Sequence, residues 1–599
     1  MMPLFEESNT YNNIQSSGKV RRIHLTSFSK KPRQFRHVVE VDTHADLQAI
    51  DQVDTRVDHQ AIDQVPSFLD PFVSSALAGV KKKKLIMPTA APPAMPENPQ
   101  REVKTEEQGG YALFARKLIK NSGIYAFASA ASPLVSLLLA PFLTRNLSHA
   151  DYGAFAVLST ALALLAGITQ LGLGSAFFRS YNYDYESQKD RLGVLSTVVV
   201  LLSLVAIPIA IVVTIAAPWL AALLVKDSSL IDAVRLVGFV ALLQNLTVPG
   251  LAWLRAESRA VLYSTVSIAN LLVSVAVTII FVGIMHMGVV GALIGMGSGF
   301  AVVLICTLPI ILLRAGVRLR LDIAQGLLSF GLPNVSAFVS VWVLQLSDRF
   351  LLGRLGSLAQ VANYSVAYSL GGALGVVVLA PFTLAWPSAM FSIAKKDDAA
   401  RIFSVVFRWY SIVLLFTAFG LSLISTVVLN LFFPPSYHSS APIIPIIAVS
   451  IVFYGTYSMF TTGVSIQRKT WFAVIFTTTS ALVNVGLNLV LIPLYGSMGA
   501  ALSTLIAYIL LAILGYIVNQ RIYPIPFEMG RFFVALGIGV GLYAGTIVLA
   551  QSRGTSVGLS IYIGALALYA GCLAILGKLP ARDQNLKRKN KYLREDIVS

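Results

Sequence analysis

The sequence predicts an all-α polytopic membrane protein with about fourteen transmembrane helices. Of its 599 residues, 56% are hydrophobic and only 13% are charged, whereas soluble domains carry about 25% charged residues. After residue 110, apolar runs of the roughly 20 residues needed to cross a bilayer recur throughout the chain. We expect spans near residues 121–143, 152–178, 192–216, 231–254, 261–286, 288–313, 327–353, 361–386, 403–433, 441–466, 471–494, 497–519, 531–550 and 556–577.

Residues 1–110 differ in composition from everything that follows. They contain the basic cluster Lys81–Lys84, a proline-rich stretch from Pro88 to Pro99 and two copies of the peptide QAIDQV. Such a segment cannot bury enough apolar surface to fold alone. We therefore interpret it as a disordered cytoplasmic tail or as the product of a start codon placed too early.

Positive charge is concentrated in alternate loops. Arg255, Arg259 and Arg314 lie in loops on one side, whereas the loops 434–442 and 495–497 on the other side contain no Lys or Arg. The positive-inside rule then places both termini in the cytoplasm. The net charge of +17 is spread between apolar runs, so it indicates topology rather than nucleic-acid binding, and Arg255 is interpreted as a topology anchor.

A short glycine motif occurs at equivalent places in two parts of the chain. Gly288–Ala292 begins the sixth expected span and Gly496–Ala500 begins the twelfth. Each follows a basic turn and an uncharged span, which predicts two six-span halves in the same orientation. Parallel repeats of this kind are typical of transporters whose pathway runs between the halves. The predicted division is a tail at 1–110, halves at 111–320 and 321–520, an extra helix pair at 521–578 and a basic tail at 579–599.

The expected span at 327–353 carries two adjacent charged residues, Asp348 and Arg349, near its outer end. A charge inside hydrocarbon costs on the order of 3 kcal/mol, so it is rarely left there without a use. At about 100° per residue, Asp348 shares a narrow arc with Asn334 and Gln345, and Leu346 faces away from it. This arc can line a polar cavity. The residues alone leave open a structural alternative, in which Asp348 is an interfacial anchor or pairs with another segment, Arg145 being the partner that we expect.

The sequence lacks the motifs of soluble enzymes. There is no G-x-x-x-x-G-K-[ST] or H-E-x-x-H, and no G-x-S-x-G elbow. Gly295–Gly299 is glycine-rich but lies within a span, where helix packing explains it. Cys306 and Cys572 lie in apolar runs and form neither a disulfide framework nor a metal site. We therefore expect no enzymatic activity, no cofactor and no metal.

Five stretches form a recognisable combination: Pro141–Leu158, Gln170–Tyr181, Phe330–Gly353, Asn363–Gly372 and Ser465–Tyr508. The first two resemble the first two spans of bacterial polysaccharide flippases, which belong to the multidrug/oligosaccharidyl-lipid/polysaccharide exporter superfamily. The next two are similar to their seventh and eighth spans, and the last is similar to their eleventh and twelfth. The resemblance covers both predicted halves but not the N-terminal tail.

The resemblance implies two six-helix halves around a central, often cationic cavity that opens alternately to each side. It also implies an undecaprenyl-diphosphate-linked oligosaccharide as cargo, for O-antigen or exopolysaccharide assembly at the cell inner membrane. The implied partners are this lipid-linked substrate, membrane lipids, and a polysaccharide polymerase with its chain-length proteins; no nucleic acid is expected. Coupling to protons or sodium is left open. The candidate cavity residues are Lys120, Asn121, Arg145, Gln170, Asn334, Gln345, Asp348, Arg349, Tyr364 and Tyr368.

Two other functions are compatible with a polytopic membrane protein. A drug or organic-cation antiporter of the same superfamily would need buried carboxylates, and apart from Asp348 the spans contain almost none. A membrane polymerase or ligase acting on lipid-linked glycans would need a long polar outer loop, which the sequence after residue 110 does not show. Both considerations favour the flippase.

Overall fold

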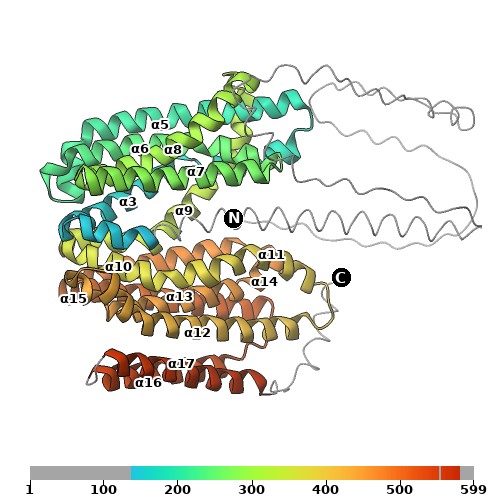
Figure 1. Cartoon of the computed structure of the whole chain (residues 1–599). Coiled ribbons are helices and arrows are strands. Elements are labelled where there is room, and N and C mark those ends of the chain that lie inside the picture. The colour runs from blue at the N-terminus through green and yellow to red at the C-terminus, as the bar shows by residue number, and fades with distance from the viewer. Residues whose placement is uncertain (1–136, 552–554, 580–599) are drawn as a thin grey trace, which may run out of the picture. The chain divides into compact units, whose positions relative to one another are not determined.

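The computed structural model describes residues 137–551 and 555–579, which form α-helices joined by short turns (Figure 1). These described residues contain no β-strand. Twelve of their helical segments are long and apolar enough to cross a membrane. The predicted fold class, an all-α polytopic membrane protein, is therefore confirmed. The division into two halves and terminal segments stays a prediction.

The helices follow one another in the order that the apolar runs predict. In the first half, residues 137–146 are helical, and the helices that follow are α3 (His149–Thr169), α4 (Leu173–Arg179), α5 (Gln188–Leu224), α6 (Ile231–Ala256), α7 (Ala260–Thr278) and α8 (Gly288–Ala315). In the second half they are α9 (Leu321–Leu355), α10 (Leu358–Leu374), α11 (Ala380–Ile393), α12 (Ala399–Phe432), α13 (Ile443–Phe460), α14 (Thr462–Ile466) and α15 (Trp471–Ile522). The extra pair is α16 (Met529–Gln551) and α17 (Thr555–Lys578).

Helix α15 contains two of the expected spans. It is 52 residues long, which is about 78 Å at 1.5 Å per residue, more than twice the roughly 30 Å of a bilayer core. The helix is interrupted at Gly496, whose φ of 56° and ψ of −131° are not helical. Positive φ costs glycine little, so the motif at Gly496–Ala500 lets the chain turn between the eleventh and twelfth spans.

Serine residues cap several helices directly after the turns between spans. The Ser148 hydroxyl accepts a hydrogen bond from the backbone N–H of Asp151 at 3.0 Å, at the start of α3. Ser187 does the same for α5, accepting from the N–H of Asp190 at 3.1 Å. These caps satisfy backbone donors that have no partner within the helix, so α3 and α5 each begin at a defined residue.

Glycines on α8 allow a close approach of α7. A Cβ at Gly295 would lie 1.9 Å from Oγ1 of Thr278, and one at Gly299 would lie 2.2 Å from Oδ1 of Asn270. Small residues at a spacing of four are a common way to pack helices in a membrane. The interpretation of Gly295–Gly299 as a packing segment agrees with this contact, which also fixes the position of Asn270 on α7.

A break between α3 and α4 lies in contact with α9. Leu171 and Gly172 both have positive φ, 51° and 66°, and they pack against α9. A Cβ at Gly172 would lie 2.2 Å from the carbonyl oxygen of Gly331. Asn334, one turn further along α9, donates a hydrogen bond to the hydroxyl of Ser175 on α4 at 3.2 Å. The glycines are therefore required by backbone approach, and α4 links the first half to α9.

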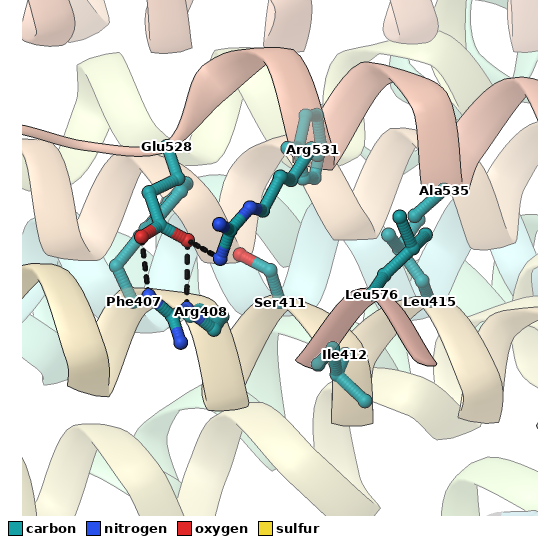
Figure 2. A pocket seen from close by; sticks show the side chains of 10 residues that line it. Phe407, Arg408, Ser411, Ile412, Leu415, Glu528, Arg531, Ala535 and Leu576 are labelled. Atoms are coloured by element: carbon teal, nitrogen blue, oxygen red, sulfur yellow. Dashed lines mark hydrogen bonds and ion pairs between the residues drawn. The ribbon is translucent and has the colours of Figure 1, made fainter. Parts of the chain in front are cut away.

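An ion cluster attaches the extra helix pair to α12 (Figure 2). Nε of Arg408 donates to Oε2 of Glu528 at 2.7 Å, and its Nη2 donates to Oε1 of the same carboxylate. Arg531 donates to Oε2 at 2.8 Å. Arg408 also reaches the carbonyl of Gly577 near the end of α17, at 3.2 Å. The pocket beside this cluster has a volume of only about 20 Å³, room for about one water molecule, so we assign the cluster a structural role.

Candidate functional site

A large cavity lies among helices from the N-terminal and middle parts of the described chain. Its volume is about 590 Å³, and its walls are formed by residues 137–146, α3, α6, α7, α8, α9 and α10. We call it the central cavity. Its polar lining consists of Tyr152, Ser159, Thr160, Tyr263, Ser267, Asn270, Ser274, Arg349, Ser365 and Ser369.

Arg349 is the only charged side chain among the residues that line the central cavity. Its guanidinium carbon lies 4.8 Å from the ring centroid of Tyr368 and 6.0 Å from that of Tyr364. These cation–π contacts hold the side chain in place. No described carboxylate lies within ion-pair distance of it, and its buried Nη1 has no hydrogen-bond partner among the described residues. Arg349 therefore presents an unused donor and a positive charge without a direct ion-pair partner among the described residues.

Two serine hydroxyl groups of the cavity wall also lack a hydrogen-bond partner among the described residues. The side-chain oxygens of Ser159 on α3 and Ser365 on α10 are buried and have no hydrogen-bond partner among the described residues. Buried polar atoms are nearly always hydrogen-bonded in native proteins. These three polar atoms come from three helices around one cavity, where a polar ligand would meet hydrogen-bonding groups that have no described partner.

Asp348 is fully buried and faces α15 instead of the cavity. Its Oδ2 accepts hydrogen bonds from the hydroxyl of Tyr364 at 2.7 Å and from that of Thr504 at 2.6 Å. Its Oδ1 accepts from Nδ2 of Asn488 at 2.6 Å, and Asn488 donates in turn to Asn484 at 3.1 Å. Because Asn488 and Thr504 lie on opposite sides of the break at Gly496, the carboxylate ties α9 to α10 and to both parts of α15.

This arrangement differs from the prediction that the arc of Asp348 lines a cavity. Neighbouring residues on a helix point about 100° apart, and the cavity side of α9 carries Leu346 and Arg349, one turn apart. Tyr364 is buried with Asp348. The contacts agree with the structural alternative, in which Asp348 pairs with another segment, because α15 packs over the Asp348 face of α9. A single helical wheel cannot show which neighbour covers which face.

The remaining sequence candidates do not gather at the central cavity. Asn334 lies at the contact between α4 and α9. Gln170 caps the end of α3, and neither it nor Gln345 lines the cavity. Lys120 and Asn121 lie outside the described residues.

Arg145 does not pair with Asp348, contrary to our expectation. Its Nε donates to the carbonyl of Phe432 at 3.0 Å and its Nη2 to that of Leu431 at 3.1 Å, both at the C-terminal end of α12. Lys226 donates in the same way to the carbonyl of Arg354 near the end of α9, at 2.8 Å. The C-terminal end of a helix carries partial negative charge, so each of these two cations stabilises the helix end that it contacts.

Sequence reasoning missed a polar stripe on α7. Tyr263, Ser267, Asn270 and Ser274 all line the central cavity. Their spacing of four, three and four residues places them on one face of a helix, and this spacing in an uncharged span was a signal that could have found them. Asn484 and Asn488 were also recognisable, because two amides four residues apart are unusual in a transmembrane segment.

The fold resembles those of two solved transporter structures. It resembles a solved structure titled "Lipid II flippase MurJ, inward closed conformation", with a TM-score of 0.59, 14% sequence identity, and coverage of 77% of this chain and 98% of that chain. It also resembles an inward-facing multidrug resistance MATE family transporter of the MOP superfamily, with a TM-score of 0.54, 15% identity, and coverage of 66% and 97% of the two chains. At these identities the likeness concerns the fold.

The family resemblance stated from the sequence is confirmed. Residues 118–393 match the family model described as "Polysaccharide biosynthesis protein". This segment contains α3 to α11 and therefore all of the described polar residues that line the central cavity. No significant match is found among curated protein sequences.

Proposed function

We propose that this protein flips an undecaprenyl-diphosphate-linked oligosaccharide across the bacterial inner membrane, for surface polysaccharide assembly, by alternating access. The observation that carries the proposal is the central cavity, which contains one unpaired cation, Arg349, within a lining of hydroxyl and amide groups. The match of residues 118–393 to a polysaccharide biosynthesis family supports the choice of cargo.

The lining suits a diphosphate-sugar head group. A phosphate needs a cation and hydrogen-bond donors, and guanidinium provides both in a geometry that matches phosphate oxygens. Sugar hydroxyls need groups that both donate and accept, and the serine hydroxyls and Asn270 amide of the wall are such groups. The lipid tail can stay in the bilayer while the head group crosses in the cavity, so no large charge enters hydrocarbon.

The same lining disfavours the organic-cation antiporter. A cation site needs a carboxylate or another negative group facing the ligand, and no Asp or Glu lines the central cavity. Asp348, the one fully buried carboxylate of the described residues, has its donors on α10 and α15. The sign of the charge in the cavity therefore favours an anionic cargo.

Deletion of the gene tests the proposed cargo. We expect lipid-linked oligosaccharide to accumulate with its sugar facing the cytoplasm, and sensitivity to cationic drugs to stay unchanged. The opposite pattern, increased drug sensitivity with normal glycan export, would instead identify an antiporter. Coupling to a proton or sodium gradient belongs to the same proposal. It is tested by measuring the flux of the lipid-linked oligosaccharide in proteoliposomes with and without each gradient.

The proposed orientation places both termini and the Arg314–Asp322 loop in the cytoplasm, because Lys and Arg concentrate on that side. In a variant whose Cys306 and Cys572 are replaced by serine, Ser436→Cys should react with an impermeant thiol reagent in cells with a permeabilised outer membrane, and Arg318→Cys should not. Both positions are exposed, so burial cannot explain a difference. Labelling at position 318 without labelling at 436 would show the reverse orientation.

A further inference from the structure

A second arginine lies at the basic-loop end of the central cavity. Arg255 is in the last turn of α6, and its guanidinium carbon lies 4.9 Å from the ring centroid of Phe178 on α4 and 5.6 Å from that of Tyr263 on α7. Tyr263 lines the cavity, and so does Leu251, one turn before Arg255 on the same helix. Two rings from two other helices therefore hold this guanidinium, and one of them, Tyr263, belongs to the cavity wall, although Arg255 itself does not line the cavity.

Arg255 has no described carboxylate within ion-pair distance, although its side of the membrane contains several. Arg179 lies 3.5 Å from Asp184, and Arg259 lies 4.0 Å from Glu257. A topology anchor needs only a positive charge in the loop. A guanidinium fixed between two rings, exposed and without a carboxylate, is in addition oriented for an anion that comes from outside the chain.

A polar path leads from Arg255 into the cavity. It begins at Tyr263 and continues along the same face of α7 through Ser267, Asn270 and Ser274. These positions span about 16 Å at 1.5 Å per residue. Arg349 lies six residues before the end of α9 at Leu355, toward the opposite membrane face. The cavity therefore has a cation beside its basic-loop end and another deeper inside, with hydrogen-bonding side chains between them.

We propose that Arg255 is a substrate-positioning residue that makes the first contact with the diphosphate group as the lipid-linked substrate enters from the basic-loop side. This inference rests on the proposed function. The phosphate oxygens accept hydrogen bonds from the guanidinium of Arg255 and then pass along the α7 stripe to Arg349. No covalent bond changes; one set of charge-assisted hydrogen bonds is exchanged for another.

The chain offers a matched control for this role. Arg259 lies four residues from Arg255 and also stacks on a ring, with its guanidinium carbon 5.3 Å from the ring centroid of Trp253. It differs in having Glu257 nearby, and Trp253 does not line the central cavity. Arg255→Gln and Arg259→Gln therefore remove the same charge from the same loop region. Only the first removes a residue that contacts the cavity wall, through Tyr263.

The test is equilibrium binding of a fluorescent polyprenyl diphosphate to the full-length protein in lipid nanodiscs, with polyprenol as the uncharged comparison. We expect Arg255→Gln to weaken diphosphate binding roughly tenfold, the loss typical of a charge-assisted hydrogen bond, with polyprenol binding unchanged. Arg255→Lys should fall between wild type and Arg255→Gln, because it keeps the charge but not the planar donor geometry. Arg259→Gln should bind as wild type does.

Three results would overturn the inference. Wild-type affinity in Arg255→Gln, or an equal loss in Arg259→Gln, would show that Arg255 contributes only loop charge, while the proposed function would stand. A wild-type protein that binds polyprenyl diphosphate no better than polyprenol would overturn the proposed function together with this inference. If Arg255→Gln is poorly folded, the comparison is made with Arg255→Lys. Wild-type affinity in Arg255→Lys would show that diphosphate binding does not need the stacked guanidinium.

Discussion

Arg349→Gln is expected to reduce glycan export roughly 10- to 100-fold, because it removes the only charge-assisted donors of the central cavity. The amount of protein in the membrane should stay at the wild-type level, since Arg349 has no described ion-pair partner that would be left unpaired. Export is measured as surface polysaccharide in a deletion strain complemented with each variant. Membrane abundance is measured in the same cells by immunoblot.

Two further variants separate the transport role from a packing role. Arg349→Lys keeps the positive charge and should recover part of the export. Arg235→Gln removes an exposed arginine that pairs with Asp232 at 2.9 Å on α6, and it should behave as wild type because such surface pairs contribute little. Full export in Arg349→Gln, or loss of the protein from the membrane, would show that Arg349 only packs against Tyr364 and Tyr368.

Asp348→Leu is expected to lower stability strongly instead of acting on transport alone. The substitution removes the shared acceptor of Tyr364, Asn488 and Thr504. Asn488 and Thr504 keep second acceptors within α15, so Tyr364 loses most. An unsatisfied buried donor costs roughly 1–3 kcal/mol, so we expect a loss of this order and a reduced amount of folded protein. The measurement is thermal unfolding of the purified protein in detergent, together with membrane abundance.

The control for this variant is Asp232→Asn, which removes an exposed carboxylate from a surface pair and should leave stability nearly unchanged. Asp348→Asn keeps one acceptor oxygen, so its stability should lie between that of wild type and that of Asp348→Leu. An Asp348→Leu protein with wild-type abundance and thermal stability would contradict the structural role that the three hydrogen bonds indicate.

The adjacent residues Asp348 and Arg349 show what sequence reasoning can and cannot provide. Their rarity within an apolar span marked both as important. Only the structure shows that Asp348 bonds to α10 and α15 while Arg349 lines the cavity. That division depends on which helix packs against which face of α9, and the pattern of a single span does not contain this information.

Other features of the protein also differ in whether the sequence predicted them. The glycine motif at Gly496–Ala500 correctly indicated the beginning of a span, because a positive φ is a local requirement. The cavity wall on α7 was not predicted, because serine and asparagine are uncharged and stand out less in an apolar span than Asp348 and Arg349 do. Arg145 was assigned the wrong partner because helix-end carbonyls, which it contacts, have no signature in a sequence.

The central claim is that an anionic lipid head group crosses the membrane through the cavity that contains Arg349. The most direct measurement is the rate at which the purified full-length protein in proteoliposomes moves a polyprenyl-diphosphate oligosaccharide between leaflets, detected by access of a glycosidase to the outer leaflet. We predict rapid movement with the wild-type protein, loss of most of this rate in Arg349→Gln, and no movement of an organic cation. Movement of the cation, or an equal rate of glycan movement in wild type and Arg349→Gln, would contradict the account.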